Sequence, residues 1–276
     1  MEKAEKQAIL IKKQSEPFWI SFLPTDVVGF LKETGEVSSF AGRFFQEVFV
    51  PPYEFKEVIR QSFEIGYRTL ALVATTAFII GVVLTLQSRP TLVRFGAEAW
   101  LPAMVSISII REIGPVVIAL ICAGKIGSGI GAELGSMKVT EQIDAMEVSG
   151  TNPFKYIVVS RIISTTLMIP LLVIMGDAVA LYGSFLAVKA KGAVSFTLYF
   201  HQVFQNLDFS DVFPAIIKTF FFGFVIGLIG CYKGYNSRNG TEGVGQSANS
   251  AVVVASLLVF VFDLIAVQVT AFFGYI

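Results

Sequence analysis

Among the ionisable side chains inside apolar stretches that are long enough to cross a membrane, four stand out. Arg111 and Glu112 are neighbours within one stretch, whereas Lys218 and Asp263 lie in two later ones. A charged group at membrane depth is costly, so it pairs with another charge or lines the route of a polar ligand. These four residues are therefore the candidates for a substrate cavity or for gating charges.

Arg111 lies about ten residues inside its stretch, which at 1.5 Å per residue places it about 15 Å deep, near the membrane midplane. Pro115 follows four residues later, lacks an N–H and displaces the carbonyl of Arg111. Such a group must face another helix, a second subunit or a wet cavity. A structural ion pair to a neighbouring helix explains it equally well.

Lys218 and Asp263 are predicted near the outer ends of two antiparallel helices, where the flexible lysine stem lets them meet. We expect a structural or gating pair in the outer half of the membrane, and contact with a lipid headgroup is the alternative. Asp177, in the third stretch, has no predicted partner.

No motif predicts catalysis, a metal site or a bound cofactor. His201 is the only histidine, and Cys122 and Cys231 lie in apolar stretches typical of buried, unreactive thiols. Residues 127–132 and 243–248 imitate a dinucleotide fingerprint without the βαβ unit that it needs. There is no phosphate-loop sequence, and the formal net charge of zero gives no nucleic-acid signal. We expect no catalytic residues in this chain.

The composition is that of a membrane protein. Of 276 residues, 54% are hydrophobic and 15% are charged, against about 25% charged in soluble domains. A membrane helix needs about 20 mostly apolar residues. The sequence predicts an all-α integral membrane protein with five transmembrane helices, at about 66–88, 101–135, 157–188, 212–233 and 250–274.

Residues 1–52 are predicted to form a cytoplasmic tail and an interfacial amphipathic helix. The apolar residues around Trp19 alternate with Asp26, Lys32 and Glu33, which is too charged to span and suits the interface plane. A soluble helix bound to a partner is the alternative. Residues 53–276 are predicted to form one membrane domain.

The orientation depends on the basic residues near the spans. The loops on the two sides carry nearly balanced numbers, so Lys56, Arg60 and Arg68 before the first span decide it. They place the N-terminus in the cytoplasm, and five spans then place Ile276 on the periplasmic side.

Two further patterns predict contact surfaces. Small residues recur at every fourth position in the second span and form a flat face for close helix packing, within one subunit or between two: Ala123, Gly127, Gly131 and Gly135. Residues 141–148 predict a short amphipathic cytoplasmic helix with Ile143 and Met146 on one side and Val148 as a further candidate for that side. An exposed apolar patch there suggests docking to a partner, and a helix folded back on the membrane is the alternative.

The same residues resemble the MlaE/YrbE permease family. The resemblance is carried by Arg111-Glu112-Ile113-Gly114-Pro115, by residues 123–137 and 140–146, and by Asn152-Pro153. It covers roughly residues 50–276, and the block 111–153 is highly specific. The segment from Gly243 to Gly245 is also similar, whereas the first 50 residues match less clearly.

The resemblance implies the permease subunit of an ABC transporter that moves phospholipids between the bacterial inner and outer membranes. Family permeases are homodimers in the inner membrane, with a separate ABC ATPase that uses ATP and Mg, an MCE-domain substrate-binding protein and often a STAS-domain protein.

The resemblance also implies roles for particular residues. It places Arg111, Glu112, Lys218 and Asp263 near the lipid cavity, and a coupling helix that meets the ATPase at Glu141, Gln142, Ile143, Asp144 and Met146. An ion-coupled secondary transporter and a membrane scaffold are the alternatives. The absence of inverted repeats argues against the first of these.

Overall fold

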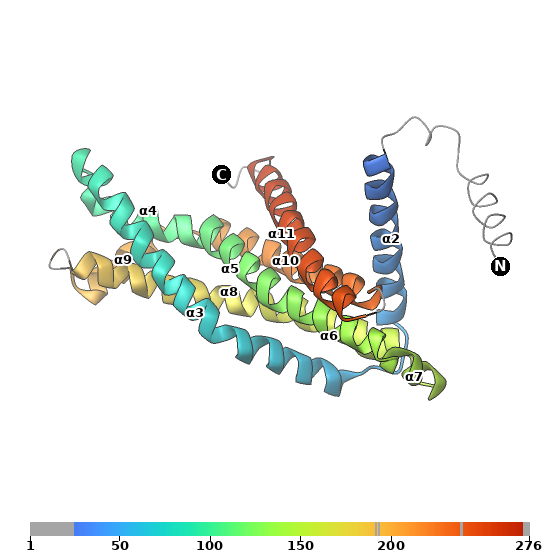
Figure 1. Cartoon of the computed structure of the whole chain (residues 1–276). Coiled ribbons are helices and arrows are strands. Elements are labelled where there is room, and N and C mark those ends of the chain that lie inside the picture. Colours follow the sequence, from blue (N-terminus) through green and yellow to red (C-terminus); the bar gives the residue numbers. More distant parts are fainter. Residues whose placement is uncertain (1–24, 191, 193, 238–239, 273–276) are drawn as a thin grey trace. The chain divides into compact units, whose positions relative to one another are not determined.

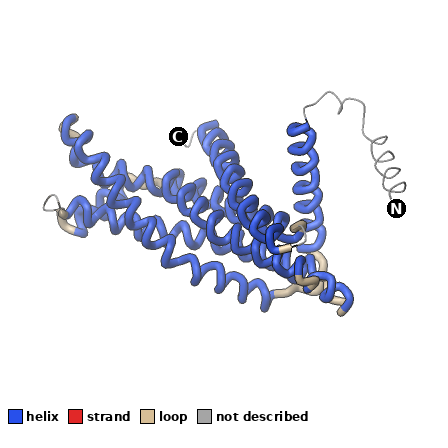
Figure 2. Tube along the Cα trace, in the orientation of Figure 1, coloured by secondary structure: helices blue, strands red, loops and turns tan. Residues whose placement is uncertain are grey.

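The computed structural model describes residues 25–190, 192, 194–237 and 240–272. The chain divides into two compact units, residues 1–46 and 47–276. Within the described residues every regular element is a helix, as predicted (Figure 2). The segment around Trp19, predicted to begin the interfacial helix, lies outside the described residues.

The first unit is dominated by α2 (Thr25–Val48). Its charged residues include Lys32, Glu33 and Glu36, and it is not among the helices apolar enough to span a membrane. The helix continues to Val48, whereas the apolar pattern that predicted an interfacial helix fades after Leu31.

Five helical segments of the described chain are long and apolar enough to cross a membrane, as predicted. The first is α3 (Phe55–Arg94), the fourth is α10 (Phe209–Tyr235) and the fifth is α11 (Thr241–Phe272). The third joins η5 (Phe154–Val159) to α8 (Ser160–Lys189). The second runs from Glu98 to Val139 through η2 (Glu98–Trp100), α4 (Leu101–Ser108), η3 (Ile109–Ile113), α5 (Gly114–Cys122), η4 (Ala123–Gly127) and α6 (Ser128–Val139).

Two helical regions were not predicted. The helix α3 has 40 residues and is therefore about 60 Å long. Its first turns were not predicted, because they carry polar residues such as Glu57 and Gln61 that hydropathy excludes from a span. The short helix α9 (Phe196–Gln205) lies between the third and fourth spans. Its N-cap Ser195 accepts a hydrogen bond from the Leu198 N–H at 3.2 Å.

The second span widens into π-helical turns where it carries charged residues. Arg111 and Glu112 lie in η3, and Lys125 lies in η4. The N–H of Gly114 bonds to the carbonyl of Ile109, five residues back. Pro115 has no N–H to offer the preceding turn, and the helix accommodates this by widening rather than by ending. The π turn just before Pro115 therefore carries both Arg111 and Glu112.

Glycines set the distance between the long helices. α3 lies along α8 (Figure 1). A Cβ atom at Gly81 would collide with the backbone carbonyl of Ala180, and one at Gly183 would lie 2.6 Å from the carbonyl oxygen of Phe78. Only glycine permits this approach, which is typical of helix pairs in membranes.

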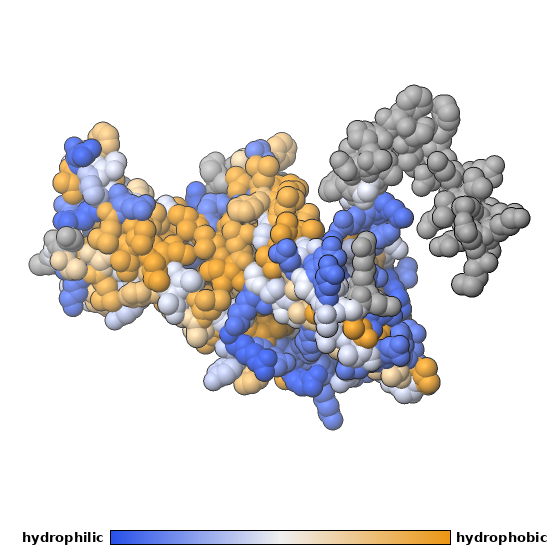
Figure 3. Space-filling model, in the orientation of Figure 1, coloured by the Kyte–Doolittle hydropathy of each residue, from blue (hydrophilic) through white to orange (hydrophobic). Residues whose placement is uncertain are grey.

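A buried hydroxyl network joins α3, α8 and α9 at one end of the bundle. The Tyr199 hydroxyl donates to Ser184 Oγ at 2.7 Å, and Ser184 Oγ lies 2.6 Å from Thr85 Oγ1. Burial raises the pKa of Tyr199, so the phenol stays protonated and keeps donating. The surface of the bundle is hydrophobic along its middle, with hydrophilic residues gathered towards its ends (Figure 3).

Candidate functional site

Three of the four predicted charges meet in one contact, centred on Lys218. Lys218 of α10 donates to Glu112 Oε2 at 2.7 Å and to Asp263 Oδ1 at 2.9 Å. Its side chain is only 6% exposed. The pair with Asp263 was predicted, but the shared contact with Glu112 was not. One ammonium group therefore ties together η3, α10 and α11.

The depths of the two partners explain why they meet. Lys218 lies nine residues after the first residue of α10, and Asp263 lies nine residues before Phe272, the last residue of α11. The two helices pack against each other and are joined by a short connection, so they run in opposite directions. Equal offsets from neighbouring ends put both groups at the same level.

Arg111 pairs with Asp211 in the first turn of α10. Both Nε and a terminal nitrogen of Arg111 contact Asp211 Oδ1. Asp211 Oδ2 accepts the backbone N–H of Asp208 at 3.0 Å and so caps the helix. Asp211 was not among the predicted site residues, although two aspartates three residues apart at a helix start are a recognisable capping signal.

A fourth carboxyl group lies behind the cluster. Asp177 of α8 packs against Gly114, where any Cβ atom would overlap with Asp177 Oδ1. That oxygen is buried and has no hydrogen-bond partner among the described residues. Asp177 therefore lies against the backbone of the turn that carries Arg111 and Glu112.

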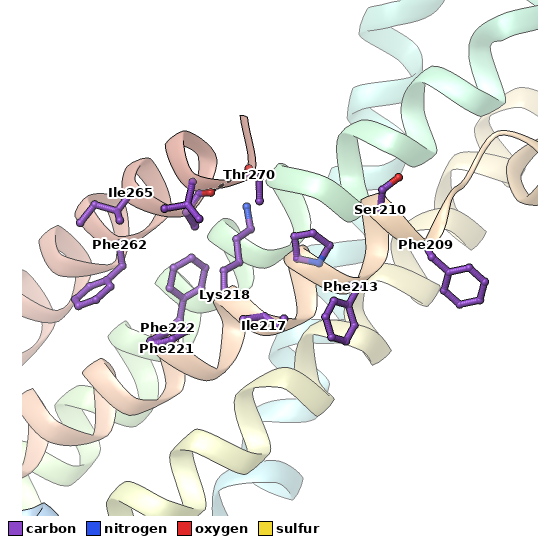
Figure 4. Close-up of a pocket in the computed structure, with 13 residues that line it drawn as sticks. Phe209, Ser210, Phe213, Ile217, Lys218, Phe221, Phe222, Phe262, Ile265 and Thr270 are labelled. Carbon is purple, nitrogen blue, oxygen red and sulfur yellow. Dashed lines mark hydrogen bonds between the residues drawn. The ribbon is translucent and has the colours of Figure 1, made fainter. Parts of the chain in front are cut away.

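An apolar cavity of about 620 Å³ opens beside the charges. It lies between α10 and α11, and Lys218 forms part of its wall (Figure 4). The rest of the wall is mostly aromatic and aliphatic, and includes Phe213, Ile217, Phe221, Phe262 and Ile265. This volume lies within the range of about 300–1,000 Å³ that is typical of small-molecule sites.

A second, small cavity of about 30 Å³ adjoins it on the charged side. Arg111, Glu112 and Asp211 line it. The two cavities share wall residues: Ser210, Pro214, Lys218, Ala266 and Thr270. An apolar compartment and a small charged compartment therefore adjoin, and an amphiphilic ligand has one part suited to each.

The charged groups of the site are held in ion pairs. The described part of the chain holds no cluster of three or more histidine, cysteine or acidic side chains that could ligate a metal ion. Cys122 and Cys231 are buried free thiols, as predicted. The arrangement can bind and release a ligand through ion pairs and apolar contact.

The small-residue row of the second span packs inside the subunit. Ala123 is fully buried, and a Cβ at Gly127 would contact Ile226 of α10 at 3.7 Å. A Cβ at Gly131 would lie 3.2 Å from the carbonyl oxygen of Ser247 of α11, and one at Gly135 would lie 3.4 Å from Val244. The row thus brings η4 and α6 against α10 and α11.

The short helix between the second and third spans is α7 (Gln142–Val148). Its N-cap Glu141 has a left-handed backbone, with φ 58°, and Lys138 fixes the helix to α6 through Asp144 at 2.9 Å. Glu141, Gln142 and Asp144 are exposed, and Met146 is half-buried.

The apolar surface of α7 differs from the prediction. Ile143 was expected in an exposed patch but is 1% exposed, because it faces the bundle, whereas Val148 is 90% exposed. Ile143 therefore anchors α7, and the free apolar side chain on this helix is Val148.

The sequence of this chain is similar to those of known proteins. The family described as Permease MlaE matches residues 58–269. A probable ABC transporter permease of Rickettsia typhi is 38% identical over 234 residues, which cover 85% of this chain and 90% of the relative. A similarly named Synechocystis protein is 34% identical over 206 residues, covering 75% of this chain and 78% of the relative.

A third relative is the intermembrane phospholipid transport system permease protein MlaE of Haemophilus influenzae. It is 35% identical over 214 residues, which cover 76% of this chain and 81% of that protein. The family match covers all five spans and the residues of the charge cluster. This chain therefore belongs to the MlaE family of ABC transporter permeases.

Proposed function

We propose that this chain is the membrane subunit of an ABC transporter that moves phospholipids between the inner and outer membranes. The observation that carries the proposal is the apolar cavity with the charge cluster at its wall. An apolar chamber of about 620 Å³ between α10 and α11 meets a chamber lined by Arg111, Glu112 and Asp211. A phospholipid has an acyl part that suits the apolar chamber and an ionic part that suits the charged residues beside it.

ATP would be hydrolysed by a separate ATPase subunit that uses Mg, and the contact with it would involve α7. Val148 projects from α7 next to the exposed carboxylate of Glu147, and a short connection leads on to the third span. Movement of the ATPase against this helix would reach α8 through η5. Glu141, Gln142, Asp144 and Met146 would border the contact, and Ile143 would hold the helix to the bundle.

A homodimer in the bacterial inner membrane is part of the same proposal. Lys125 lies in η4 on the exposed side of the second span, where Gly129 and Ser136 are also exposed. A charged side chain and small residues suit lipid poorly, and a second subunit or a wet cavity would shield them. An MCE-domain protein and a STAS-domain protein would complete the assembly.

The test is reconstitution of the full chain with its ATPase in vesicles that carry a fluorescent phospholipid. We expect ATP-dependent transfer of the lipid to an acceptor. Phe213→Arg and Phe221→Arg, which charge the apolar chamber, should reduce transfer at least fivefold while the ATPase still copurifies. Transfer that is independent of ATP, or unaffected by both substitutions, would overturn the proposal.

A further inference from the structure

The charges of the cluster do not balance. Arg111 is matched by Asp211, but Lys218 is shared by Glu112 and Asp263. Two cations and three carboxylates meet, so the fully ionised group carries a net charge of −1. The excess charge at this site is negative.

The group that can reach a ligand most readily is a carboxylate. Glu112 is 44% exposed, whereas Lys218 is 6% exposed and already donates to two acidic side chains. Its neighbour Arg111 is 32% exposed. An acidic and a basic side chain are thus accessible at adjacent positions of one helical turn, both on the wall of the small cavity.

We infer that the site selects lipids whose headgroup carries an ammonium group beside the phosphate. The ammonium would contact Glu112 and bring the missing positive charge, and the phosphate would contact the exposed edge of Arg111. This inference rests on the proposed function and adds the class of headgroup to it. An anionic headgroup without an ammonium would increase the excess of negative charge at membrane depth, which is costly in a medium of low dielectric.

The sign of the selectivity follows from which charges are already paired. A site for an anionic headgroup would present a cation with no acidic partner. Here both cations of the cluster are held by carboxylates at ion-pair distance. A phosphate without an ammonium group would add a further negative charge to the cluster, whereas an ammonium group supplies the positive charge that the cluster lacks.

The experiment uses two photoactivatable phospholipids with the same diazirine-bearing acyl chain, one with an ethanolamine and one with a glycerol headgroup. Each is mixed into nanodiscs that contain the full-length chain and equal amounts of both unlabelled lipids. After illumination, labelled peptides of α10 and α11 are quantified by mass spectrometry. We expect roughly fivefold more labelling by the ethanolamine probe, which corresponds to about 1 kcal/mol.

Two variants test the residue responsible. Glu112→Gln keeps the size of the side chain and leaves Lys218 paired with Asp263, so it should fold and should lower the preference to near one. Glu98→Gln is the matched control, because Glu98 is an exposed carboxylate that pairs with Arg89 away from the cluster, and it should keep the wild-type preference. Thermal unfolding in detergent verifies that both variants are folded.

The outcomes separate this inference from the function on which it rests. Equal labelling by the two probes, or a preference for the glycerol headgroup, would overturn the inference while lipid binding at the cavity stands. Labelling of α10 and α11 by neither probe would overturn the lipid site itself. A preference that survives Glu112→Gln would assign the selectivity to another residue and so also overturn the inference.

Discussion

At the scale of single residues, the ion pairs of Lys218 connect three helical segments, η3, α10 and α11. Lys218 is the buried cation that both Glu112 and Asp263 contact. Its removal would leave two carboxylates facing each other without a counter-charge. Loss of one member of a buried ion pair is more destabilising than its replacement together with its partner.

We therefore predict that Lys218→Met lowers the free energy of unfolding by about 3 kcal/mol. The double variant Lys218→Met with Asp263→Asn should regain part of the loss, because one of the unmatched charges is removed as well. Reversible unfolding in mixed micelles measures both. A single variant as stable as the wild type would show that solvent or another cation already satisfies Glu112 and Asp263.

The residues of this cluster differ in how far the sequence could predict them. Lys218 and Asp263 stand out because each interrupts an apolar stretch. Asp211 lies just before the predicted fourth span, where an acidic residue is unremarkable without knowledge that Arg111 lies opposite. The contact of Asp177 with Gly114 depends on the packing of α8 against the second span, which no spacing within either helix encodes.

At the scale of the helix, glycines decide how closely two elements approach. A methyl group at Gly81 would meet the Ala180 carbonyl, which belongs to the backbone of α8 and cannot rotate away. We predict that Gly81→Ala lowers stability by about 2 kcal/mol through overpacking. Thermal unfolding in detergent measures it.

The matched control is Gly245→Ala in α11. A Cβ at Gly245 meets no atom within 4 Å, so this variant should keep its stability or gain up to about 1 kcal/mol from helix propensity. If both variants behave alike, close approach of α3 and α8 does not limit the fold at Gly81.

The apolar side chains of α7 differ in burial, although the sequence predicted a single exposed patch for docking. Ile143 and Met146 were predicted to dock a partner because they share one side of a short helix. Amphipathicity alone cannot tell whether the apolar side faces the protein's own bundle or a partner. The burial of Ile143 and the exposure of Val148 make the distinction.

We predict that Val148→Asp weakens copurification of the ATPase at least tenfold while thermal stability changes by less than about 0.5 kcal/mol, as for other exposed positions. Ile143→Asp should instead destabilise the chain, because it buries a carboxylate among apolar neighbours. Undiminished ATPase binding by a folded Val148→Asp variant would contradict a docking role for this end of α7.

At the scale of the whole molecule, composition predicts the five spans and the apolar central part of most helices, because only long apolar helices are stable in lipid. The ends of the helices do not follow. α3 begins at Phe55 and α9 forms between two spans, since helices continue into water wherever packing and polar contacts support them. Hydropathy reports only the part that lies in lipid.

The orientation across the membrane is the remaining property of the whole molecule, and two exposed positions at opposite ends of the bundle test it. Ser149 follows α7, and Ala99 lies at the start of the second span. Lys138 and Lys233 at the α7 end are nearly balanced by Arg89, Arg94 and Lys189 at the other end, so Lys56 and Arg60 in the first turns of α3 give the α7 end its excess of basic residues. Because basic residues stay on the cytoplasmic side, this end should face the cytoplasm.

We predict that a membrane-impermeant maleimide labels Ala99→Cys in spheroplasts and labels Ser149→Cys only in inside-out vesicles. Cys122 and Cys231 can remain in place, since both thiols are fully buried, and the wild-type chain gives the background. The reverse labelling pattern would place α7 in the periplasm, where no ATP-hydrolysing subunit could reach it. The coupling role of α7 would then be wrong even if the cavity binds lipid.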